Sequence, residues 1–176
     1  MTKRARQYIG LIAAIIFYYV IHEGAHLVYA VATGVFKSVK FMGLGMQIDV
    51  YAERMTELQL GMFCAVGAIS TLIFSYVLIA LIGRISKVQS NLFRACAYYV
   101  TIAMLLIDPL YLSLLCGFFG GGDMNGIALL VPEIAIRIAF FCILIGNAVV
   151  FVKIVLPKYQ RMFGGCAIEE IRKETL

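Results

Sequence analysis

Four long apolar runs dominate the sequence and limit the folds that are open to it. They cover Tyr8–Val31, Leu58–Gly83, Leu92–Phe119 and Ile127–Leu156. Each run is longer than the roughly 20 residues that an α-helix needs to cross a bilayer. Only 14% of the residues are charged, against about 25% in an average soluble domain. The runs therefore predict an all-α polytopic membrane protein with about four transmembrane helices.

The segments between and after these runs predict the rest of the organisation. We expect one transmembrane domain over residues 1–157 and a short charged tail over residues 158–176, with a surface helix near Ile168–Lys173. Between the first two runs, residues 35–51 (VFKSVKFMGLGMQIDVY) are rich in β-formers and contain two glycines, which predicts a short β-hairpin. In the fourth run, Pro132-Glu133 predicts the start of the helix, since proline is favoured in a first turn.

The distribution of basic residues predicts how the chain is oriented in a membrane. Lysines and arginines gather before the first run, between the second and third, and after the fourth, whereas residues 117–126 contain none. Because cytoplasmic loops carry the excess of Lys and Arg, we expect a multi-pass protein of the cell membrane with both termini in the cytoplasm. The net charge of +5 follows from these flanks, so we expect a lipid bilayer as a partner and no nucleic acid. Small residues in the second run permit an oligomer but do not require one.

One cluster of polar residues interrupts the first apolar run. It reads His22-Glu23-Gly24-Ala25-His26 and contains both histidines of the chain. Residues four apart lie on one face of a helix, so both imidazoles can reach one metal ion, and Glu23 can reach a water molecule bound to that ion. Ionisable side chains in a membrane span cost roughly 2.5–3.5 kcal/mol each, which indicates a functional role. The motif predicts the Zn²⁺ site of a hydrolase. A structural polar cluster between helices is the alternative.

The two histidines need a third protein ligand, because a catalytic zinc site takes three and keeps one position for water. The chain has no other histidine, so we expect a carboxylate. Asp123 is the preferred candidate, since the glycines of residues 120–126 let the backbone approach the motif closely. Asp108, inside the third run, is either an alternative ligand or a partner that orients one imidazole through its second nitrogen. Asn125 is a further candidate for either of these two roles.

These residues resemble the site-2 protease family of intramembrane zinc metalloproteases. Three pieces carry the resemblance: HEGAH in an apolar run, the strand-like KSVKFMGLGMQID after it, and an Asp-containing segment that opens a later run. The segment around Asp123 reads GFFGGGDMNGI, whereas the usual family motif is N-x-x-P-x-x-x-L-D-G, so the chain looks like the small divergent bacterial-type members. The family commonly places its zinc site towards the cytoplasm, whereas the charges of this chain place the motif in the outer half of the first run.

The resemblance implies that His22, His26 and Asp123 bind zinc and that Glu23 is the catalytic acid and base. It also implies a protease that uses metal-activated water to cleave a peptide bond in or near a membrane-embedded protein or peptide substrate. Two alternatives use the same region of the chain. One is a membrane metal transporter or sensor that carries or detects the ion without hydrolysis. The other is a zinc membrane protease in which a glutamate, such as Glu53, replaces Asp123 as the third ligand.

Overall fold

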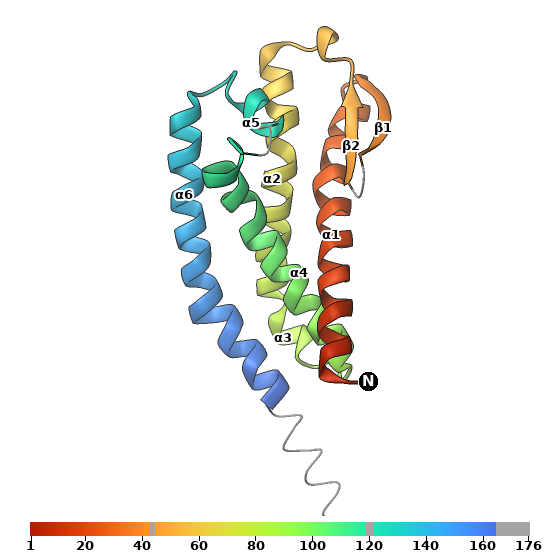
Figure 1. Cartoon of the computed structure of the whole chain (residues 1–176), viewed down its shortest axis with the longest axis vertical. Helices are drawn as coiled ribbons and strands as arrows, with labels where there is room; N and C mark the ends of the chain where they lie inside the picture. Colours follow the sequence, from red (N-terminus) through yellow and green to blue (C-terminus); the bar gives the residue numbers. More distant parts are fainter. Residues whose placement is uncertain (43–44, 119–121, 165–176) are drawn as a thin grey trace, which may run out of the picture.

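Four long helices and one small hairpin dominate the described part of the chain (Figure 1). The apolar runs predicted the helices, and residues 35–51 predicted the hairpin. The computed structural model describes residues 1–42, 45–118 and 122–164. The four helices that begin with α1, α2, α4 and α6 are long and apolar enough to cross a membrane. The elements are, in chain order, α1 (Lys3–Ala32), β1 (Phe36–Met42), β2 (Gly45–Val50), η1 (Ala52–Arg54), α2 (Glu57–Ala80), α3 (Ile82–Ile85), α4 (Asn91–Leu110), η2 (Tyr111–Leu115), α5 (Gly122–Ile127), α6 (Glu133–Val150) and η3 (Phe151–Val155).

Local sequence signals explain where α2 and α6 begin. At α2, the Thr56 hydroxyl accepts a hydrogen bond from the N–H of Gln59, and the Gln59 side chain accepts one from the N–H of Thr56. This reciprocal capping satisfies two backbone donors that have no partner inside the helix. At α6, Pro132 is the N-cap residue and the helix starts at Glu133, which confirms the predicted start.

The last helix is longer than its apolar run. It continues from α6 through η3 to residue 164, so the expected boundary between residues 157 and 158 falls inside a helix. Tyr159 lies in this extension and is buried against Ile82 and Ile85 at the turn of α3. The surface helix expected near Ile168–Lys173 lies outside the described residues.

The third apolar run changes its helical geometry near its end. Pro109 lies in the last turn of α4 and has no N–H for the helical ladder. Just beyond it, η2 is a π-helical turn in which the N–H of Cys116 donates to the carbonyl oxygen of Tyr111 at 2.8 Å. The Ser113 hydroxyl donates to the carbonyl oxygen of Pro109. A proline and a neighbouring π-turn are known causes of helix distortion, and they set the direction of the chain before α5.

The predicted hairpin lies beside the second half of α1 (Figure 1). β1 and β2 pair antiparallel, from Phe36 opposite Val50 to Met42 opposite Gly45. Gly34 turns the chain from α1 into β1 with φ of 72°, a left-handed angle that glycine adopts without steric cost just past a helix end. Among the described residues β2 pairs with β1 alone, so its second edge is left for other contacts.

Three helices form the centre of the bundle, and the remaining helices lie around them. α1, α2 and α4 pack against one another, α5 packs on α2, and α6 packs on α4 and η2 (Figure 1). Three buried clusters follow the bundle from the hairpin end towards the N-terminus. Their representative members are Phe63 and Leu112 in the first, Val100 and Met104 in the second, and Ile82 and Val155 in the third.

A buried amide links α6 to the rest of the bundle. Asn147 is 1% exposed, and its Nδ2 donates to the carbonyl oxygen of Leu105 on α4 at 2.7 Å. Its Oδ1 accepts a hydrogen bond from the Tyr76 hydroxyl of α2 at 2.6 Å. One side chain therefore joins α2, α4 and α6, where apolar packing alone gives little directional preference.

We expect Asn147→Leu to destabilise the purified protein by about 1 kcal/mol, because two interhelical hydrogen bonds are lost and the Leu105 carbonyl oxygen stays buried. Thermal unfolding in a mild detergent measures the change. Tyr76→Phe is the matched control: it removes one of the two bonds and should cost less. A variant Asn147→Leu as stable as the wild type would show that apolar packing alone positions α6.

Candidate metal centre

The first helix points both histidines into the bundle. His22 and His26 lie one turn apart on α1 and are 8% and 3% exposed. Tyr18, one turn before His22, stacks on its ring with 5.3 Å between the centroids. Phe63 of α2 packs against the ring of His26, with 4.7 Å between the ring centroids. These contacts hold the two imidazoles on the side of α1 that faces α2 and α4.

Asp123 reaches both imidazoles from α5. Its Oδ2 lies 3.1 Å from Nε2 of His22 and 3.6 Å from Nε2 of His26. α5 lies close enough to α2 that a side chain at Gly126 would collide with the sulfur atom of Cys64. Burial raises the pKa of the Asp123 carboxyl, but the interactions with His22 and His26 outweigh burial and lower the pKa to about 2.

The three side chains are close enough together to share one metal ion. One ligand atom from each lies within 4.8 Å of the other two, so His22, His26 and Asp123 could hold a metal ion. Ligand atoms at about 2.0–2.1 Å from one tetrahedral ion lie about 3.3 Å apart, and the two histidine–aspartate separations of 3.1 and 3.6 Å bracket that value. α2 presents bare backbone to this space at Gly67. A Cβ there would lie 2.5 Å from Nε2 of His26 and 2.7 Å from Nε2 of His22.

A second carboxylate holds His22 from its other side. Asp108 of α4 is 1% exposed, and its oxygens lie 3.4 Å from Nδ1 of His22. The hydroxyl of Tyr18 donates to Asp108 at 2.6 Å, and the hydroxyl of Thr71 on α2 also donates to it. A histidine whose Nδ1–H donates to a carboxylate keeps a lone pair on Nε2 for a metal. By contrast, Nδ1 of His26 is buried and has no hydrogen-bond partner among the described residues.

Glu23 lies beside this group and contacts the hairpin. Its Oε2 accepts a hydrogen bond from the backbone N–H of Ile48 at 3.1 Å. Ile48 belongs to β2, so this N–H lies on the edge that β1 does not occupy. The bond fixes the Glu23 carboxylate between α1 and the hairpin.

An open cleft of about 600 Å³ leads to these residues. The carboxylates of Glu23 and Asp123 and both imidazoles line its floor. One wall is β2 from Gly45 to Ile48, and the facing wall comes from α4 and η2. The facing wall is largely apolar and includes Ile107, Leu110, Tyr111 and Leu115.

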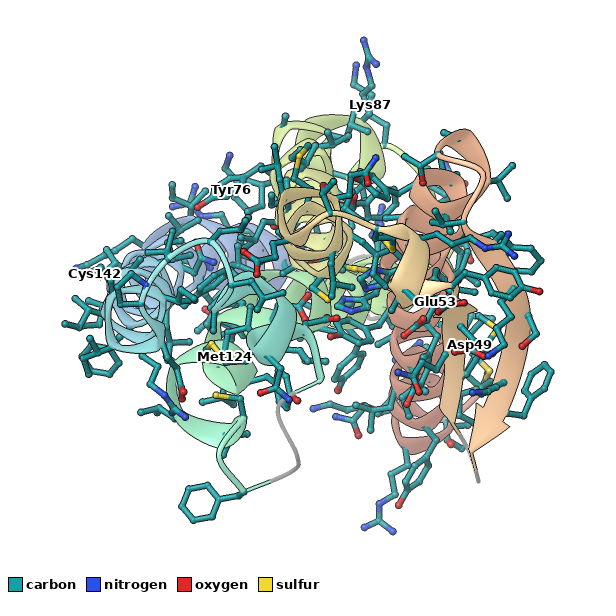
Figure 2. All side chains as sticks on the ribbon, turned by 90° about the horizontal axis from the view of Figure 1, so that it is seen from above. Asp49, Glu53, Tyr76, Lys87, Met124 and Cys142 are labelled. Carbon is teal, nitrogen blue, oxygen red and sulfur yellow. The ribbon has the colours of Figure 1, made fainter. Side chains whose placement is uncertain are left out.

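Other candidates from the sequence lie elsewhere. Asn125 is an exposed residue of α5 and does not line the cleft. Glu53 lies in η1 after the hairpin, and the metal group that the described residues form contains no glutamate. Asp49 of β2, a further carboxylate near the hairpin, pairs with Lys40 at 2.9 Å and with Lys37 at 3.4 Å, and the hydrogen bond from Lys40 lowers the pKa of Asp49. Figure 2 shows Asp49 and Glu53 together on the hairpin side, apart from Met124 of α5.

Four supporting residues were not predicted from the sequence. Tyr18 and Thr71 bind Asp108, Gly67 leaves room at the histidines, and Ile48 binds Glu23. Tyr18 has the one local signal among them, because it lies four residues before His22 and so shares its helix face. The other three act from separate elements, and the chain sequence does not show which elements meet.

Comparison with known proteins adds no relative to this picture. No model of a known protein family, no curated protein and no solved structure matches the chain. The functional assignment therefore depends on the residues of the site and on their arrangement.

Proposed function

We propose that the chain is an intramembrane zinc metalloprotease that cleaves a peptide bond in or near a membrane-embedded protein or peptide. One observation carries the proposal: His22, His26 and Asp123 converge within 4.8 Å at the floor of an open cleft that also contains Glu23. Two histidines and a carboxylate are a ligand set of catalytic zinc sites, and an open side leaves a position for water. A purely structural polar cluster does not need the access that this cleft gives.

In this proposal the ligands are Nε2 of His22, Nε2 of His26 and a carboxylate oxygen of Asp123. When bound, the metal supplies Lewis acidity, which makes a water molecule acidic near neutral pH and polarises a substrate carbonyl group. Asp108 keeps His22 in the tautomer with its proton on Nδ1, with Tyr18 and Thr71 holding the Asp108 oxygens. Orientation of this kind supports metal affinity in many zinc proteins.

Glu23 transfers the protons of the reaction. Its carboxylate accepts a proton from the attacking water, whose oxygen adds to the carbonyl carbon of the scissile peptide. The C–N bond then breaks, and Glu23 returns the proton to the departing amine nitrogen. The hydrogen bond from Ile48 N–H at 3.1 Å keeps the carboxylate in place between these two transfers.

The long helices and the distribution of basic residues support a membrane setting for this site. Four helices are long and apolar enough to cross a bilayer, and the basic flanks favour both termini in the cytoplasm. The cleft wall contains the exposed apolar residues Ile107 and Leu110, which suits an apolar substrate segment. The free edge of β2 offers backbone groups to an extended peptide, the usual geometry of strand addition.

We expect about one zinc ion per chain in detergent-purified wild type, and a clear loss of zinc in Asp123→Ala, because the group then keeps only two ligands. Elemental analysis measures both. Asn125→Ala is the matched control, since Asn125 is an exposed residue on the same short helix, and it should keep its zinc. Equal zinc contents of the wild type and Asp123→Ala would indicate that another carboxylate is the third ligand. A wild type that takes up no metal would refute the proposal.

Glu23→Gln should keep its zinc and lose cleavage by about 10²- to 10⁴-fold, because an amide holds the shape of the side chain but accepts no proton. His22→Ala should lose both zinc and cleavage. New peptide termini are measured by mass spectrometry after the variants are reconstituted in liposomes with membrane proteins. Zinc flux into the same liposomes is measured in parallel. Flux without cleavage in the wild type would favour a transporter over a protease.

Ile48→Pro should reduce the rate constant of cleavage by about 10- to 100-fold through misplacement of Glu23, with zinc content unchanged. Proline removes the N–H that binds Glu23 and is tolerated at a strand edge that has no partner strand. Ile48→Ala is the matched control, because it shortens the same buried side chain and keeps the N–H. If both variants lose activity equally, packing of the Ile48 side chain rather than its N–H is responsible.

A further inference from the structure

A second cavity lies at the opposite end of the bundle from the metal group. It has a volume of about 570 Å³ and is formed where the start of α1, the start of α4 and the extension of α6 meet. Figure 1 shows these three chain segments together at the lower end, below the hairpin and α5. None of its lining residues belongs to the cleft described above.

The cavity is cationic. Lys3 and Arg6 of α1 line it, and the lining contains no acidic residue. The chain segments that surround this end, residues 1–7, 81–98 and 153–164, contain several lysines and arginines and no aspartate or glutamate. An anion that enters therefore meets two cations without competition from a carboxylate of these segments.

One polar atom of the cavity wall lacks a partner. The side-chain oxygen of Asn91 is buried and makes no hydrogen bond among the described residues. Asn91 lines the cavity. A buried polar atom without a partner is destabilising, so a ligand group that donates to it is favoured. Tyr159 also lines the cavity, but it is 1% exposed and its hydroxyl interacts with the side chain of Thr101.

Apart from Gln7 and Gln160, the rest of the wall is aromatic and aliphatic. Tyr98, Leu156 and Phe163 line it, and exposed apolar residues of α1, such as Ile9 and Ile12, follow from the same end. A fitting ligand thus has an anionic head for Lys3 and Arg6 and an apolar body for the helix surfaces.

We propose that this cavity binds the headgroup of an anionic glycerophospholipid. The phosphate lies between Lys3 and Arg6, while a headgroup hydroxyl donates to the Asn91 oxygen. Phosphatidylglycerol has a net negative phosphodiester and such hydroxyls, whereas in phosphatidylcholine a quaternary ammonium offsets the phosphodiester charge and no hydroxyl donor is present. Binding ties the first turn of α1 to α4 and to the last helix, and it needs neither zinc nor Glu23.

Native mass spectrometry of the full chain tests this proposal in micelles that contain equal amounts of phosphatidylglycerol and phosphatidylcholine. The wild type should retain phosphatidylglycerol preferentially. Lys3→Gln and Arg6→Gln should each weaken retention by about fivefold, as expected for the loss of one cation near a phosphate. Arg4→Gln is the matched control, because Arg4 has the same charge on the same helix turn but does not line the cavity. It should bind as the wild type does.

A second measurement distinguishes the loss of lipid binding from the loss of the folded structure. Thermal unfolding of the same proteins should show that phosphatidylglycerol stabilises the wild type and Arg4→Gln, and stabilises Asn91→Leu less, although Asn91→Leu keeps the size of the side chain. Equal retention of phosphatidylglycerol and phosphatidylcholine by the wild type would overturn the proposal. An equal loss in Arg4→Gln would also overturn it and indicate general surface attraction. Stabilisation by inorganic phosphate to the same extent would assign the cavity to a free phosphate instead of a lipid.

Discussion

The buried carboxylate of Asp108 is the interaction on which the arrangement of the central helices depends. It lies inside α4 and is 1% exposed, so its charge must be satisfied within the protein. Tyr18 and His22 of α1 and Thr71 of α2 supply the partners. Because Asp108 and its partners come from three helices, α1, α2 and α4 have one relative rotation and depth in which the carboxylate is satisfied. Packing of apolar faces alone would allow several such arrangements of the three helices.

Small residues on α2 turn this arrangement into a site. Gly67 lets the two imidazoles approach the α2 backbone, and the contact between Cys64 and Gly126 brings α5 against the same helix. Asp123 then lies beside the histidines, although it is 97 residues from His26 in the sequence. Glu23 is held from the opposite direction by the edge of β2. Each side chain of the site is thus supported by an element other than its own, which is how rigid sites hold their geometry.

The sequence was sufficient for features with a local cause. Apolar runs predicted the long helices, β-formers between glycines predicted the hairpin, and the spacing of His22 and His26 placed them on one face. Asp123 was chosen from ligand chemistry and loop glycines, and the structure brings it to the histidines. The roles of Thr71, Gly67 and Ile48 could not be predicted, because each depends on which helix or strand lies opposite. The last helix is longer than its apolar run predicts, because Pro157 does not end the helix, which continues to residue 164.

The two proposals together would account for the access of water to a site inside an apolar helix. The 19 residues from Lys3 to His22 span roughly 28 Å of α-helix, close to the roughly 30 Å thickness of the hydrocarbon layer. If Lys3 and Arg6 hold a lipid phosphate at one surface, His22 lies near the opposite boundary of the apolar layer. α1 continues beyond it for ten residues to Ala32, so the hairpin reaches past that boundary. The metal group is then deep enough to meet a membrane-embedded segment and shallow enough for water to enter through the cleft.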